Sequence, residues 1–131
     1  GNPIAMSAGL AMLRHLQEHP EVYIRLEEIG TKLVDGFRAG LAKTGLTYTI
    51  NHIGSMFTLF MTDRAVTNFS EAKTSDLALF GRYFQAMLKR GVYLAPSQFE
   101  SLFLSVALSD DLVSQIIQAN EESLQEALAG A

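Results

Sequence analysis

Two histidines are the first residues whose type and spacing could support chemistry. His15 and His19 lie four residues apart in a predicted helix, so their side chains share one helix face and could bind a metal ion. A metal site needs at least one further ligand, no third candidate stands near the pair, and His19 directly precedes the helix-breaking Pro20. We therefore interpret both histidines as surface or domain-contact residues, and we predict no metal site.

Carboxylate pairs and nucleophiles offer no better candidate. Glu27 and Glu28 are adjacent in sequence, as are Asp110 and Asp111, so on a helix the members of each pair point to different sides. Such pairs are typical of a solvated face. The chain has no cysteine, which excludes disulfides, thiolate nucleophiles and cysteine-bound zinc. It also has no glycine-rich phosphate loop and no nucleophile elbow. These residues alone therefore indicate a folded domain without a self-evident reaction.

Composition excludes several other classes of function. The chain has 131 residues, of which 48% are hydrophobic and 18% are charged, which suits one folded domain and excludes intrinsic disorder. A formal net charge of −4 gives no basic surface for nucleic acid or an anionic membrane. No apolar run reaches the roughly 18 residues of a membrane span. We expect no nucleic-acid partner, no membrane association and a cytoplasmic protein.

The first predicted helix is apolar on nearly every side. Asn2 is a suitable N-cap, Pro3 suits the first helical position, and the helix runs to about His19. Its apolar residues cover most of the helical wheel: Ile4, Met6, Leu10, Met12, Leu13 and Leu16. A helix of this kind is covered on more than one side, which a domain of this size cannot provide alone. We therefore divide the chain into 1–19, a connecting helix that another part of the protein covers, and 20–131, a small domain.

Periodicity predicts an α+β fold for the remainder of the chain. Apolar residues at three- and four-residue steps indicate helices, and alternation of apolar and polar residues indicates half-buried strands. The expected elements are a helix over 21–43, strands over 46–51 and 55–62, a polar loop over 62–74, a helix from 77 that ends at Gly91, a turn over 96–100, a strand over 102–107 and a last helix capped by Ser109. This order predicts a small three-stranded, mainly antiparallel sheet with helices on one face.

Three segments resemble a known family. Residues 1–9, GNPIAMSAG, look like a stretch shared by class III pyridoxal-phosphate enzymes. Residues 54–57, GSMF, followed by a phenylalanine-rich strand, resemble a segment of the glutamate-1-semialdehyde 2,1-aminomutases. Residues 91–100, GVYLAPSQFE, are similar to the signature of that aminomutase family and are the most specific of the three. The resemblance covers essentially the whole chain and implies the C-terminal domain of a fold-type I pyridoxal-phosphate enzyme.

The resemblance also implies a reaction and a cofactor. Enzymes of this family convert glutamate-1-semialdehyde to 5-aminolevulinate, the tetrapyrrole precursor, with pyridoxal 5′-phosphate bound as a Schiff base to a lysine of the large domain. That lysine, and a threonine that helps to hold the cofactor phosphate, lie upstream of the matching segment. None of the lysines of this chain matches the Schiff-base motif: Lys32, Lys43, Lys73 and Lys89. We therefore expect the chain alone to be inactive, and the whole protein to be a homodimer in which this domain contacts its own large domain.

Glu100 is the one active-site residue that the resemblance assigns to this chain. Aminotransferases of this fold place an arginine in the region to bind a substrate carboxylate as a bidentate pair, whereas this chain has no arginine after Arg90. A glutamate suits instead an amino group of the substrate, or the cofactor-side lysine. The resemblance therefore implies that Glu100 contacts substrate or cofactor. The alternative is an exposed turn residue without a catalytic role.

Two departures from the family pattern keep other functions open. The family usually continues with Ala-Gly after the glutamate, where this chain has Ser101 and Leu102, and a family histidine is replaced within 106–109. One alternative is another class III pyridoxal-phosphate aminotransferase. The other is a non-enzymatic α+β interaction module.

Overall fold

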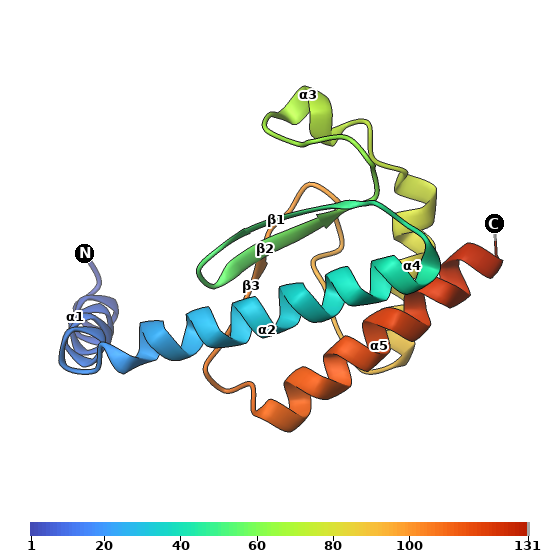
Figure 1. Ribbon diagram of the computed structural model, residues 1–131. Helices are drawn as coiled ribbons and strands as arrows, with labels where there is room; N and C mark the ends of the chain where they lie inside the picture. Colours follow the sequence, from blue (N-terminus) through green and yellow to red (C-terminus); the bar gives the residue numbers. More distant parts are fainter. Residues whose placement is uncertain (131) are drawn as a thin grey trace.

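The computed structural model describes residues 1–130, which form a three-stranded sheet and five helices (Figure 1). In chain order the elements are α1 (Pro3–Glu18), α2 (Glu21–Thr44), β1 (Thr49–Ile53), β2 (Met56–Phe60), α3 (Phe69–Ala72), α4 (Leu77–Lys89), β3 (Leu102–Phe103) and α5 (Asp110–Ala129). The strands lie in the order β1-β2-β3, and both pairings are antiparallel. The predicted fold class is confirmed.

The helix boundaries follow from the capping residues that the sequence supplies. Asn2 accepts a hydrogen bond from the Ile4 backbone N–H at 2.9 Å and begins α1, and Ser109 accepts one from the Leu112 N–H at 3.2 Å and begins α5. Gly45 ends α2 in the left-handed conformation, with φ of +73°, which glycine adopts without a steric penalty. The four long helices therefore lie where periodicity and caps predicted them.

All three strands are shorter than predicted, since β2 runs over Met56–Phe60 instead of 55–62, and α3 was not predicted. β1 begins at Thr49 instead of residue 46, because the Leu46 N–H still bonds to the Leu41 carbonyl at the end of α2. β3 stops after Phe103 instead of reaching residue 107, because a turn at 105–108 replaces it. The predicted loop over 62–74 contains α3, for which Asn68 is the N-cap.

The core lies between one face of the sheet and helices α2, α4 and α5. On α2 the buried stripe is Ile29, Leu33, Val34, Phe37 and Leu41. The ring of Phe37 meets the ring of Phe57 on β2 edge-on, with 5.3 Å between centroids. Figure 1 shows α3 on the opposite side of the sheet from α2, where Phe60, Val66 and Ala72 form a second, smaller cluster. Helices α2, α4 and α5 thus cover one face, as predicted, and the 61–75 segment covers part of the other.

Small residues allow α5 to pack closely on α2. A Cβ added at Gly36 would lie 2.6 Å from Ile117 side-chain atoms, and one added at Gly40 would lie 2.9 Å from Nδ2 of Asn120. Both distances are shorter than van der Waals contact, so the observed helix separation requires glycine or a local shift. At the N-terminal end of α5, Asp110 pairs with Arg25 of α2 at 3.0 Å, and Arg25 lowers the pKa of Asp110.

A buried hydrogen bond joins α4 to α5. The Tyr83 hydroxyl donates to Oδ1 of Asn120 at 2.7 Å, and the two residues are 1% and 0% exposed. Burial raises the pKa of Tyr83 well above its usual value, so the hydroxyl keeps its proton. Because water does not reach this pair, loss of one partner leaves the other without a hydrogen bond.

Helix α1 has no buried residue. Ile4 is 79% exposed, Met6 67% and Leu13 68%, although all three are large apolar side chains. Figure 1 places α1 beyond the N-terminal end of α2, away from the sheet. An exposed apolar helix of this kind is typical of a contact surface.

We expect Tyr83→Phe to lower the free energy of unfolding by about 1–3 kcal/mol, since Oδ1 of Asn120 then loses its partner in the core. Tyr93→Phe is the matched control, because Tyr93 is 73% exposed and should change stability by less than about 0.5 kcal/mol. Urea unfolding followed by circular dichroism measures both. Equal losses for the two variants would contradict the role of the buried pair.

For the chain in isolation, we expect the apolar surface of α1 to cause self-association or fraying of that helix. Replacing Met6 and Leu13 with glutamate should give a monomer or change the helical signal, whereas glutamate at Ser7 and Gln17 adds the same charge without removing apolar surface. Sedimentation and circular dichroism check this. A monomer with the same helical signal before and after the first pair of changes would show that no such surface exists.

Candidate functional site

The segment 91–100 forms a turn between α4 and β3 that presents Glu100 to solvent. Gly91, with φ of +79°, ends α4 and redirects the chain, and Leu94 is buried in the core. Farther along, the Glu100 N–H donates to the Ser97 carbonyl at 3.2 Å and closes the turn. The Glu100 side chain is exposed. The predicted site residue thus lies at the end of an ordered turn, two residues before β3.

Gln98 fastens this turn to strand β2. Its side chain is 3% exposed, its Oε1 accepts from the Met61 N–H at 3.1 Å, and its Nε2 donates to the Leu59 carbonyl at 2.7 Å. Sequence reasoning missed this residue, because a polar side chain in a turn is normally exposed. The sequence did contain one signal for Gln98, which lies within 91–100, the most specific of the three family-like segments.

The surroundings of the turn are partly polar and partly aromatic. The Thr58 hydroxyl on β2 lies 3.4 Å from the hydroxyl of Ser101 and 3.5 Å from the Glu100 carbonyl oxygen. The ring of Phe99 meets the ring of Phe69 on α3 edge-on, with 5.5 Å between centroids. A cavity of about 20 Å³ beneath the turn has room for about one water molecule. The backbone at Glu100 is therefore held in place by its neighbours. The residue itself is exposed and can contact another molecule or domain.

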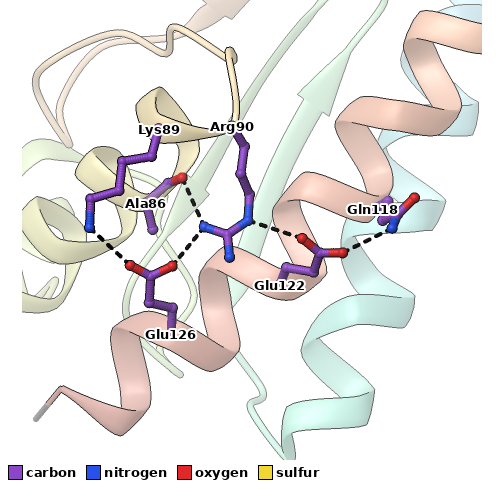
Figure 2. A network of polar contacts seen from close by, with 6 residues as sticks. All are labelled: Ala86, Lys89, Arg90, Gln118, Glu122 and Glu126. Atoms are coloured by element: carbon purple, nitrogen blue, oxygen red, sulfur yellow. Dashed lines mark hydrogen bonds and ion pairs between the residues drawn. The ribbon is translucent and has the colours of Figure 1, made fainter.

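Arg90, the arginine closest to the turn in sequence, is committed to helix α5. Its guanidinium donates to Glu122 at 3.1 Å and to Glu126 at 2.7 Å, and also to the Ala86 carbonyl at 3.1 Å (Figure 2). The hydrogen bonds that Arg90 donates to the Glu126 and Glu122 carboxylates raise the pKa of Arg90. Arg90 therefore serves the packing of α4 on α5 and is not free to bind a substrate carboxylate.

The lysines lie on the surface of the domain. Lys43 pairs with Glu121 at 2.6 Å, and Lys89 pairs with Glu126 at 3.2 Å. Lys32 lies 3.6 Å from Asp110, and Lys73 lies over the ring of Phe69. Within residues 1–130, no lysine lines the cavity beneath the turn.

The other candidates from the sequence lie on different elements from Glu100. The ring centroids of His15 on α1 and of His19, the C-cap of that helix, lie 4.4 Å apart, and Nδ1 of His19 is 2.8 Å from a carboxylate oxygen of Glu21. The described residues contain no group of three side chains arranged to hold a metal ion. Glu28 lies 3.5 Å from Arg25, so one acidic pair contributes to the ion pairs of α2. No helix within residues 1–130 is long and apolar enough to span a membrane.

The chain is similar to known proteins in both sequence and structure. No protein-family model matches it. The glutamate-1-semialdehyde 2,1-aminomutase of Cytophaga hutchinsonii is 56% identical over 126 residues, which are 96% of this chain and 29% of that protein. The chain thus spans less than a third of the length of this relative.

Solved structures share the fold. An omega-transaminase from Sphaerobacter thermophilus superposes with a TM-score of 0.82 and 27% identity, over 98% of this chain and 29% of that one. A transaminase with PLP bound superposes with a TM-score of 0.81 and 24% identity, over 98% and 28% of the two chains, and shows the fold alone. The chain is thus similar over nearly its whole length to glutamate-1-semialdehyde 2,1-aminomutases, and its fold matches that of the C-terminal domain of fold-type I transaminases.

Proposed function

We propose that the protein carrying this chain is a pyridoxal-phosphate-dependent aminomutase that converts glutamate-1-semialdehyde to 5-aminolevulinate for tetrapyrrole biosynthesis. The observation that carries the proposal is the exposed Glu100 carboxylate on a turn that Gln98 fastens to β2. The 56% identity to an enzyme named for this reaction supports the same conclusion.

The role of Glu100 follows from the chemistry of a carboxylate. An ionised glutamate only accepts hydrogen bonds, and it forms its strongest ones with a charged amino group. The substrate of the proposed reaction carries an amino group that must move between neighbouring carbons. We propose that Glu100 binds this amino group, or the lysine that exchanges protons with it, and holds it in place.

The absence of a free arginine at the turn supports an aminomutase over an aminotransferase of the same fold. An arginine would bind a carboxylate, and glutamate-1-semialdehyde has an aldehyde where glutamate has its α-carboxylate. Arg90 cannot take that role while Glu122 and Glu126 hold its guanidinium. This contact is the specific reason to prefer the aminomutase.

Pyridoxal phosphate, when bound, would supply the electron sink for the reaction. The residues of this chain suit a domain that faces the cofactor without binding it covalently, because a cofactor-binding lysine is enclosed and the lysines here are exposed or paired at the surface. We propose that an N-terminal large domain provides that lysine and the phosphate-binding threonine. We also propose that 1–19 connects the two domains, with 20–131 as the small domain, and that the whole protein is a cytoplasmic homodimer.

In the full-length protein, we expect Glu100→Gln to slow turnover of glutamate-1-semialdehyde by roughly ten- to a hundredfold, because a charge-assisted hydrogen bond is lost. The melting temperature should stay nearly unchanged, since the side chain is exposed. Glu27→Gln on α2 is the matched control and should keep full activity. Unchanged turnover in Glu100→Gln across the pH range would refute the assignment, and a large fall in melting temperature would show a structural residue instead.

The chain alone should not acquire a specific covalent link to pyridoxal phosphate. After incubation with the cofactor, borohydride reduction and digestion, we expect only low-level labelling spread over several surface lysines, because all four lysines are exposed. Mass spectrometry of the peptides provides the readout. Stoichiometric labelling of a single lysine within residues 1–131 would contradict this.

A further inference from the structure

We propose that Gln98 is a positioning residue for Glu100: its side-chain amide replaces a missing stretch of β3 along the edge of β2 and so frees the 97–100 backbone to turn outward. This inference rests on the proposed function of Glu100. It concerns how the domain holds that carboxylate in place.

The pairing register shows what Gln98 replaces. The ladder between β2 and β3 stops at Phe57. The same register carried further along β2 would place Glu100 opposite Leu59. It would place Gln98 opposite Met61. In an antiparallel strand, alternate residues direct their N–H and C=O groups to the same neighbour. Phe57, Leu59 and Met61 therefore all face the edge where β3 would continue.

A continued strand would satisfy this edge with backbone groups, but the chain does so with one side chain. Oε1 of Gln98 accepts from the Met61 N–H at 3.1 Å, and Nε2 donates to the Leu59 carbonyl at 2.7 Å. A primary amide provides one acceptor and one donor on the same planar group, which suits two neighbouring edge positions. The Leu59 carbonyl and the Met61 N–H therefore keep partners although the main chain has left this edge.

The released main chain forms the turn. Instead of bonding to Leu59, the Glu100 N–H donates to the Ser97 carbonyl at 3.2 Å. Two further contacts of the turn are weaker, since the Thr58 hydroxyl lies 3.5 Å from the Glu100 carbonyl and Phe99, whose ring meets Phe69, is 41% exposed. Gln98, at 3% exposure, is the buried attachment that fixes where Glu100 emerges.

The test uses the full-length protein and a double-mutant cycle. Gln98→Met keeps the side-chain length and removes both hydrogen bonds, and Gln85→Met, at an exposed position on α4, is the matched control. We expect Gln98→Met to lower kcat for glutamate-1-semialdehyde by about ten- to a hundredfold through misplacement of Glu100, with a smaller change in KM. In a Glu100→Gln background, the same change should lower kcat by less than about twofold, because both substitutions act on one interaction.

The outcomes separate this inference from the proposed function. If Glu100→Gln lowers kcat and Gln98→Met does not, the positioning role is wrong and the role of Glu100 stands. The same conclusion follows if the two reductions in kcat multiply fully in the double variant. If Glu100→Gln alone keeps full turnover, the role of Glu100 fails and the positioning role fails with it.

A second variant covers the case in which Gln98→Met does not fold. A protonated carboxyl offers one donor and one acceptor, like the amide, whereas a carboxylate accepts only. The activity of Gln98→Glu relative to the unsubstituted protein should therefore rise as the pH is lowered. A ratio that stays constant with pH would overturn the proposal.

Discussion

The hydrogen bonding of strand β2 is the constraint on which the rest of the domain depends. β2 is the central strand, and four of its five residues are buried. Its N–H and C=O groups therefore need partners on both edges. β1 satisfies one edge along its whole length, whereas β3 covers only the start of the other. Gln98 bonds two groups of the uncovered part, the Leu59 carbonyl and the Met61 N–H, so the requirement that stabilises the core also determines where the Glu100 turn leaves the sheet.

Helix α2 holds this sheet in place by packing on two sides. Its apolar stripe, which includes Phe37, lies against β2, and its glycines let α5 approach closely. A Cβ added at Gly30 would lie 2.5 Å from the Gly54 carbonyl oxygen, so the β1–β2 hairpin also rests directly on α2. Helix α5 in turn holds the end of α4, because Glu122 and Glu126 of α5 form ion pairs with Arg90. The 91–100 segment begins at this point.

Much of the fold could be predicted from sequence, because it depends on local signals. These signals act over only a few residues. They are the N-caps Asn2 and Ser109, the C-cap Gly45 of α2, and the apolar periodicity of α2. The length of β3 could not be predicted, because its residues have strand-like composition and only the tertiary contacts of the 97–101 turn and the 105–108 turn limit the pairing. The small helix α3 had a local signal, Asn68 with Glu71 three residues later, which the polar composition of the segment obscured.

The residues of the candidate site also fall into two groups, those with a signal in the local sequence and those that depend on distant contacts. Glu100 was identified from a family-like segment, and the structure places it on an exposed turn. Gln98 was overlooked, because its burial depends on a strand edge almost forty residues earlier in the chain. The commitment of Arg90 to α5 likewise depends on residues that are distant in sequence.

The most direct measurement is a crystal structure of the full-length protein with pyridoxal phosphate and a substrate analogue that carries the amino group. The account predicts a Glu100 carboxylate oxygen within about 3 Å of an amine nitrogen of the ligand or of the cofactor-binding lysine, with the Gln98 amide still bonded to β2. A Glu100 side chain that points into solvent, away from both nitrogens, would contradict it.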